Sequence, residues 1–125
     1  MLPGIEARMT LKDHIVWLSA LLEGEGSFPL WKARRSVTIL LTMTDRDVVE
    51  RAALLLGGTK AYLDRPAILV GPRAPRKAAW RCSVSGPRAA AWMMTLYGLM
   101  GERRREQIRR VLSGWRSPRA SGHGG

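Results

Sequence analysis

Two glutamates alternate with two glycines at residues 23–26, and this acidic turn is the stretch of the sequence whose residue types could do chemistry. Negative charge is unfavourable at a helix C-terminus, where the macrodipole favours lysine or arginine. A residue that contradicts the preferences of its position in a helix is often part of a functional site. Carboxylates beside accessible glycine carbonyls are ligands for a hard divalent cation. The turn therefore predicts a metal site, and the alternative is an ordinary helix end with solvated glutamates.

The segment before the acidic turn must position it. Thr10 and Asp13 have the spacing of a capping box, which predicts a helix that begins near Leu11. Residues 15–22 are apolar on every side except at Ser19, whereas a helix at the protein surface has an apolar face and an opposite polar face. This pattern predicts burial on two faces, one against the chain's own domain and one against a second molecule.

The residues WLSALLEGEGSF, at positions 17–28, resemble the signature of the LAGLIDADG homing endonucleases, and the resemblance extends more weakly to about Leu112. It implies an α+β fold with a four-stranded antiparallel saddle-shaped sheet backed by helices, one domain per chain. The signature occurs once, so the twin of its helix must come from a second chain, and the resulting two-fold axis implies a near-palindromic target. The residues expected at this homodimer interface are Trp17, Leu18, Ser19, Leu21 and Leu22.

The resemblance also assigns roles at the catalytic centre. Glu25 would bind the metal, with the Gly24 carbonyl beside it. A basic residue, aligned best with Arg104 and alternatively with its two arginine neighbours, would stabilise the pentavalent phosphate. The implied metal is Mg²⁺, with Mn²⁺ as a substitute and Ca²⁺ supporting binding only. The sequence departs from the family in three ways, because Ala20 replaces a glycine, glutamate replaces aspartate, and arginine replaces the commoner lysine.

Alternating residues predict four strands, at 27–35, 37–44, 59–65 with an extension through 68–70, and 79–85. The first two form a hairpin with one apolar and one mixed face, and such a ribbon can present side chains to base edges in the major groove. The basic loop between the last two strands would contact phosphates, unless it is an ordinary solvated loop. The expected DNA contacts are Trp31 (alternatively packed under a loop), Arg34, Arg35, Thr38, Thr42, Arg73, Arg76, Lys77, Arg81 and Ser83.

Three more helices are predicted. One begins after Thr44 or Asp45 and ends at Gly57–Gly58. The family places a polar active-site residue near this junction, but capping is the expected role of both candidates. The next helix opens with Pro87 at its first position, and its core residues are expected to be Ala90, Ala91, Met94, Leu96 and Tyr97. After a break near Gly98, the last helix begins at about residue 101.

The composition restricts the class of partner. The 125 residues suffice for one domain, expected at 11–114 between an arm at 1–10 and a basic tail at 115–125. A net charge of +11 points to a polyanion, first nucleic acid and second an acidic membrane surface. No apolar run approaches the roughly 18 residues of a membrane-spanning helix, and the first residues do not form a signal peptide. The single cysteine, Cys82, predicts a reducing compartment and a buried thiol.

Together these features predict a cytoplasmic, homodimeric DNA endonuclease of a bacterial or phage-infected cell that serves intron mobility, with no small-molecule cofactor and no membrane partner. A DNA-binding regulator or an RNA maturase on the same scaffold is the alternative, which the glutamate and arginine replacements slightly favour. An unrelated reading is a basic membrane-associated or RNA-packaging module.

Overall fold

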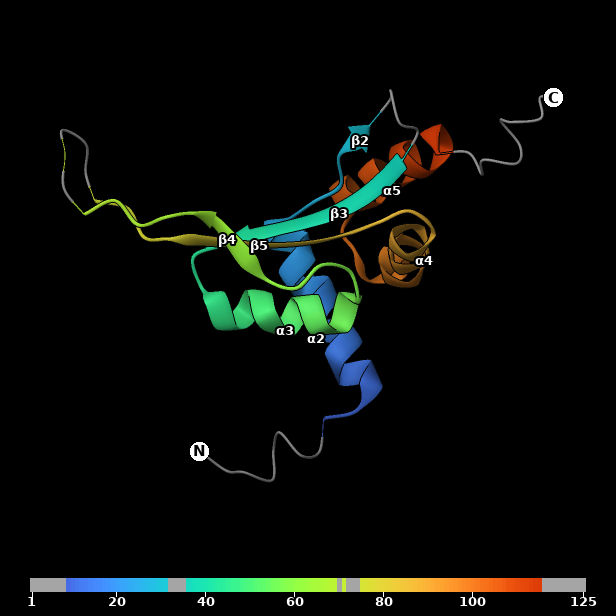
Figure 1. Ribbon diagram of the computed structural model, residues 1–125. Helices are drawn as coiled ribbons and strands as arrows, with labels where there is room; N and C mark the ends of the chain where they lie inside the picture. The colour runs from blue at the N-terminus through green and yellow to red at the C-terminus, as the bar shows by residue number, and fades with distance from the viewer. Residues whose placement is uncertain (1–8, 32–35, 70, 72–74, 116–125) are drawn as a thin grey trace.

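An antiparallel sheet forms the centre of the chain, and α2, α3 and α4 lie on one side of it (Figure 1). The computed structural model describes residues 9–31, 36–69, 71 and 75–115. The elements in chain order are α2 (Leu11–Glu25), β1 (Gly26–Ser27), β2 (Leu30–Trp31), β3 (Ser36–Met43), α3 (Arg46–Leu56), β4 (Tyr62–Arg65), β5 (Ala79–Ser85), α4 (Pro87–Leu96), the 3₁₀ helix η1 (Tyr97–Leu99) and α5 (Glu102–Gly114). The expected α+β class and the antiparallel sheet backed by helices are confirmed.

The helix that carries the acidic turn begins where the sequence predicts. The Thr10 hydroxyl accepts a hydrogen bond from the Asp13 backbone N–H at 3.1 Å, and the Thr10 N–H donates to the Asp13 carboxylate at 2.9 Å. This capping box satisfies two N–H groups that have no partner within the helix. The hydrogen bonds favour the charged carboxylate and lower the pKa of Asp13.

The sheet is four strands wide, because β1 and β2 both pair with β3 and share one edge. The order across the sheet is β1, β3, β5, β4, and every pair is antiparallel. The first predicted strand is therefore interrupted. Pro29 lies in the gap between its two parts, and proline has no N–H group to donate to a neighbouring strand.

The edge strand β4 is shorter than predicted. The chain instead crosses the end of β5 at residues 58–59, where the Thr59 N–H donates to the Ser83 carbonyl at 2.8 Å and the Thr59 hydroxyl accepts from the Ser83 N–H. Gly58 fits there because a Cβ atom would lie 2.1 Å from the Ser83 carbonyl oxygen. Beyond β4, an isolated pair joins Ile68 to Arg76 in an extension that projects from the body of the domain (Figure 1).

The core lies between the sheet and the helices. Leu41 pairs with Cys82 and Ile39 with Val84, and all four side chains are buried. Cys82 is a core residue as expected, and burial raises the pKa of its thiol to about 11. No helix in the described part of the chain has the length and apolarity needed to cross a membrane.

The buried face of α4 differs from the one predicted. Its core residues are Ala89, Ala90, Met93 and Leu96, whereas Met94 is 61% exposed and Ala91 is also exposed. The prediction was wrong for these two residues by one position. Residues 89–94 are apolar throughout, and only the exposed Arg88 and Thr95, near the two ends of the helix, indicate which side faces solvent.

The capping box gives a test of how α2 begins. Thr10→Ala removes one acceptor at the helix N-terminus and should lower the free energy of unfolding by about 1 kcal/mol. Urea unfolding followed by circular dichroism measures this difference. Thr95→Ala is the matched control, because its exposed hydroxyl bonds only within α4. Equal effects of the two substitutions would contradict the capping role.

Candidate nucleic-acid interface and metal centre

The acidic turn closes α2 without an unusual backbone conformation. Gly26, the C-cap, has φ −78° and ψ 169°, so it is extended rather than left-handed. It is buried, and a Cβ atom there would lie 2.8 Å from the Leu22 carbonyl oxygen. Gly24 is exposed, with no atom within 4 Å of a built Cβ. Glycine would permit unusual dihedrals in the turn, but neither Gly24 nor Gly26 has a positive φ. Space dictates glycine at position 26, and no steric reason requires it at position 24.

Arg104 holds this turn from the other end of the chain. Its Nε donates to the Glu23 carbonyl at 3.0 Å, and its Nη2 donates to the Gly26 carbonyl at 2.8 Å. Its Nη1 donates to Gln107 at 2.9 Å. In return, the Glu23 carboxylate accepts the N–H of Gly101, the N-cap of α5, at 2.8 Å. We call these contacts, from Glu23 and Gly26 to Gly101, Arg104 and Gln107, the Arg104 clamp.

The central residue of the clamp is buried. Arg104 is only 6% exposed, and its guanidinium lies 5.5 Å from the centre of the Phe28 ring. Burial lowers the pKa of this guanidinium, but arginine keeps its charge in proteins. A cation at this position offsets both the dipole of α2 and the negative charge of the turn.

Glu25 itself is exposed and faces a hollow of about 480 Å³. The other residues that line this Glu25 hollow are Thr42, Met43, Thr44, Arg65 and Ala79. The end of α2, the end of β3 and the end of β4 thus meet at one place. A carboxylate, two hydroxyls and one guanidinium are brought together, although they are far apart in the sequence. Arg104 does not line the hollow.

The oxygen ligands of the turn suit a magnesium ion only in part. Mg²⁺ is commonly bound through one or two carboxylates, with water and substrate phosphates completing its octahedron. The exposed Glu25 carboxylate and the uncrowded Gly24 are compatible with such an open site. Among the described residues, no group of three histidine, cysteine, aspartate or glutamate side chains forms a complete cage. Further ligands would have to come from a second chain or from a phosphate.

The face of the sheet turned away from the core is polar. This open face consists of Thr38, Leu40 and Thr42 of β3 and Arg81, Ser83 and Ser85 of β5, which lie opposite one another in register. The structure therefore brings together Thr42, Arg81 and Ser83 as the sequence predicts. Thr38 differs, because it is only 6% exposed and its hydroxyl lies 3.0 Å from that of Ser85. Its assignment as a surface contact is corrected.

Arg81 has partners that the sequence did not reveal. Its Nε donates to the Thr42 hydroxyl at 3.1 Å and lies 3.4 Å from the Asp64 carboxylate. The two members of this ion pair are partly buried. Asp64 therefore neutralises and orients the guanidinium of Arg81.

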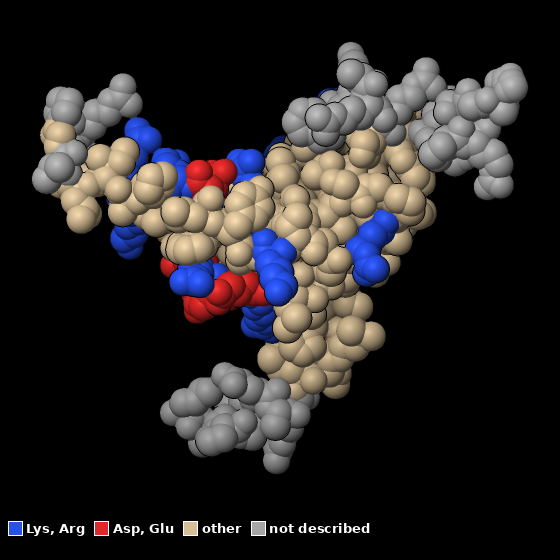
Figure 2. All heavy atoms as spheres, viewed as in Figure 1, with Lys and Arg blue, Asp and Glu red and all other residues tan. Residues whose placement is uncertain are grey.

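The other predicted nucleic-acid contacts lie near the β4–β5 extension or outside the described residues. Arg76 and Lys77 are exposed. Figure 2 shows basic side chains along this extension, and residues 66–78 include no acidic residue. Trp31 belongs to β2, and Arg34, Arg35 and Arg73 lie outside the described residues.

The arginines of α5 form a separate group. Glu102 pairs with Arg105 and Arg109, and Glu106 pairs with Arg109 and Arg110. The hydrogen bonds from the two arginines lower the pKa of Glu102. Because these pairs are exposed, each contributes little stability. Two glutamates offset two of the three positive charges, so this group keeps a net charge of +1.

The expected dimer contacts divide into two sets. Leu18, Ser19 and Leu22 are buried in the chain's own core, and Ser19 donates to the Leu99 carbonyl at 3.3 Å. These three side chains are not accessible to a second subunit, which corrects their assignment. Trp17 and Leu21 are half-buried, and Arg51 stacks on the Trp17 ring at 3.8 Å.

The face of α2 that remains accessible is defined by other residues. Val16 is 46% exposed, and Ala20 and Gly24 are exposed as well. Residues four positions apart lie on the same side of a helix. This exposed stripe of Val16, Ala20 and Gly24 leads directly to Glu25.

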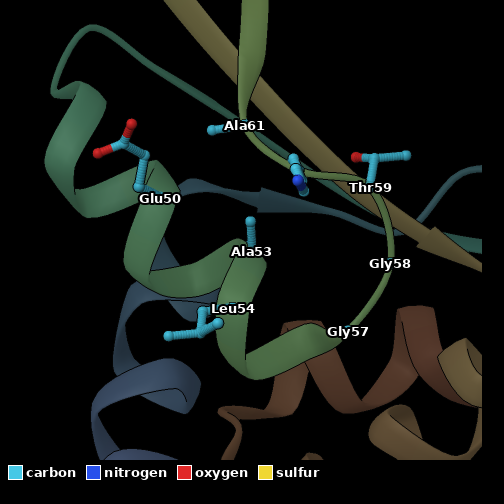
Figure 3. Close-up of a pocket in the computed structure, with 8 residues that line it drawn as sticks. Glu50, Ala53, Leu54, Gly57, Gly58, Thr59 and Ala61 are labelled. Atoms are coloured by element: carbon cyan, nitrogen blue, oxygen red, sulfur yellow. The ribbon is translucent and has the colours of Figure 1, made fainter.

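A second hollow, of about 460 Å³, lies between α3 and the segment that leads into β4 (Figure 3). Ala53 and Leu54 of α3 and Ala61 of the following segment contribute to its lining. Its one carboxylate, Glu50, is paired with Arg46 at 3.0 Å. Thr59 and Lys60 also line this hollow, so it differs from the Glu25 hollow in that its carboxylate is paired.

Comparison with known proteins gives no match to any family model, curated protein or solved structure.

The two glycines of the turn provide a matched pair of substitutions. Gly26→Ala should lower the free energy of unfolding by about 1–3 kcal/mol, because its methyl group would overlap Leu22. Gly24→Ala meets no atom and replaces a helical glycine, so it should be neutral or stabilise by up to about 1 kcal/mol. Urea unfolding at two protein concentrations separates folding from association. A larger cost at position 24 than at position 26 would contradict this description of the turn.

Proposed function

We propose that the chain is a homodimeric, metal-dependent endonuclease of the LAGLIDADG type that binds double-stranded DNA on the open face of its sheet. The observation that supports this most is the Glu25 hollow. There a free carboxylate lies beside two hydroxyls and a guanidinium, at the margin of a polar sheet face. The net charge of +11 supports a polyanionic substrate. The order of the elements also supports the proposal, because α2 precedes the strands of the first hairpin and α3 precedes β4 and β5, as in the family.

In the proposed reaction, a DNA phosphate lies at the mouth of the Glu25 hollow. Arg65 binds a non-bridging oxygen, and Thr44 donates a hydrogen bond to the phosphate or to the attacking water. Glu25 and the Gly24 carbonyl would hold Mg²⁺ through hard oxygen ligands. A bound Mg²⁺ would supply an activated water and stabilise the leaving oxygen. Each subunit would hydrolyse one strand, and by resemblance the product would be a double-strand break with short 3′ overhangs.

The second subunit of the proposed dimer packs on the exposed stripe of α2. Small side chains at positions 20 and 24 let two helix backbones approach closely, and Val16 adds apolar area. A two-fold axis along this stripe brings the two Glu25 carboxylates near each other, because Glu25 follows the stripe at the end of the helix. Two like charges at short range need a cation between them, which is consistent with shared metal binding.

A DNA-binding regulator or RNA maturase without cleavage is the second candidate. The observation that favours it is that the three nitrogens of Arg104 are each bonded within the protein. The basic residue expected from the family alignment is thus not free to bind phosphate. Arg65 must then supply the positive charge if the chain is a nuclease.

Cleavage distinguishes the two candidates. Purified protein incubated with the DNA that flanks its own gene should give a mobility shift in Ca²⁺ and a discrete double-strand cut in Mg²⁺. Glu25→Gln should lower the cleavage rate by at least about 10²–10³-fold while DNA affinity stays within a few-fold. Glu50→Gln is the matched control, because this exposed glutamate belongs to a surface ion pair.

The outcomes are distinct. A shift without cleavage by the unmodified protein would select the regulator. A Glu25→Gln variant that cuts at the normal rate would remove Glu25 from the catalytic centre.

The oligomeric state tests the proposed use of the exposed stripe. Ala20→Glu places a carboxylate at the centre of the stripe, twice in a dimer, and should weaken dimerisation by at least tenfold, which corresponds to about 1.4 kcal/mol. Ala91→Glu makes the same change at an exposed position of α4. Sedimentation velocity with and without duplex DNA measures the effect. A single subunit on the duplex, or equal behaviour of the two variants, would contradict the interface.

A further inference from the structure

We infer that Arg104 is a positioning residue that fixes the acidic turn by binding the carbonyl groups on either side of Glu25, and does not itself contact phosphate. The role of this contact in directing the Glu25 side chain into its hollow rests on the proposed function. The contact itself does not.

The direction of the guanidinium is the first argument. Its Nε, Nη1 and Nη2 each donate to an acceptor of the chain, at 3.0, 2.9 and 2.8 Å. The side chain is only 6% exposed. These bonds use three of the five N–H donors of the guanidinium, and burial of the side chain keeps a phosphate oxygen from the other two. Arg104 also does not line the Glu25 hollow.

The position of the two bound carbonyls is the second argument. The Glu23 carbonyl precedes the Gly24–Glu25 segment, and the Gly26 carbonyl follows it. Fixing both peptide groups fixes the backbone between them, and with it the direction in which the Glu25 side chain leaves. The hydrogen bond from Gly101 to the Glu23 carboxylate anchors the same turn a third time.

The choice of arginine is the third argument. A guanidinium is a rigid planar fork that can bind two carbonyl oxygens in a defined geometry, whereas the ammonium of lysine is a compact point charge on a flexible stem. Binding Glu23 and Gly26 at once uses this fork. The presence of arginine, where the family alignment expects lysine, thus has a structural reason in this chain.

The test compares Arg104→Lys and Arg104→Met with Arg110→Lys and Arg110→Met, which change an exposed arginine of the same helix. Backbone amide exchange is measured by NMR in the full chain without metal or DNA. In Arg104→Lys the amides of Glu25 and Gly26 should exchange at least about tenfold faster, while those of Leu41 and Cys82 in the central strands stay within about twofold. The Arg110 variants should change neither group. If Arg104→Met does not fold, Arg104→Lys still provides the comparison.

Binding of Mn²⁺, followed by electron paramagnetic resonance, links the turn to the proposed metal. Glu25→Gln should abolish the site, and Arg104→Lys should weaken it by about 10–100-fold, as for other residues that orient a metal ligand. Unchanged exchange at the turn, or equal acceleration throughout the chain, would overturn the positioning role. Equal Mn²⁺ binding by the unmodified protein and Glu25→Gln would instead overturn the proposed metal centre, while amide exchange still decides the role of Arg104.

Discussion

The hydrogen bonds of Arg104 to the carbonyls of Glu23 and Gly26 are the constraint on which the acidic end of α2 depends. Two glutamates at a helix C-terminus are unfavourable because the dipole is already negative there. A buried guanidinium reverses this local field, and a hydrogen bond to a charged group contributes about 1.5–3 kcal/mol. Glu23 is used for this attachment, which leaves Glu25 as the exposed carboxylate. The two acids of the turn therefore have different roles, one structural and one available for ligands.

Much of the fold could be predicted because its signals are local. The capping box at Thr10, the left-handed glycine at Gly57 and the proline at the start of α4 each mark an element within a few residues. The alternation of apolar and polar residues at 79–85 predicted the bounds of β5 and which of its faces is buried. Prediction failed where the hydrophobic pattern was uninformative or where a single residue interrupted the predicted element. Pro29 divided the first strand, and the alanine-rich start of α4 left the phase of that helix undetermined.

The candidate site was predictable only in part, because its members come from distant segments. Glu25 stood out as a carboxylate in a place where the helix dipole opposes it, but nothing near Arg65 in the sequence indicates that it lies beside Glu25. The family resemblance pointed to the junction at Thr44, although capping was the role expected there. Residues 15–22 of α2 are apolar on more than one side. Which side faces its own core depends on tertiary packing, and the sequence could not show that Leu18 and Leu22 are internal.

The Arg104 clamp joins residues separated by 78–81 positions, so the two halves of the contact leave the ribosome at very different times. Closing so long a loop is entropically costly until the intervening sheet has formed. During synthesis, α2 can form by itself, but the tip of this helix stays without its cation until α5 emerges. A nascent or truncated chain would thus hold Glu25 loosely, and the acidic tip would reach its final geometry only as the last part of the domain folds.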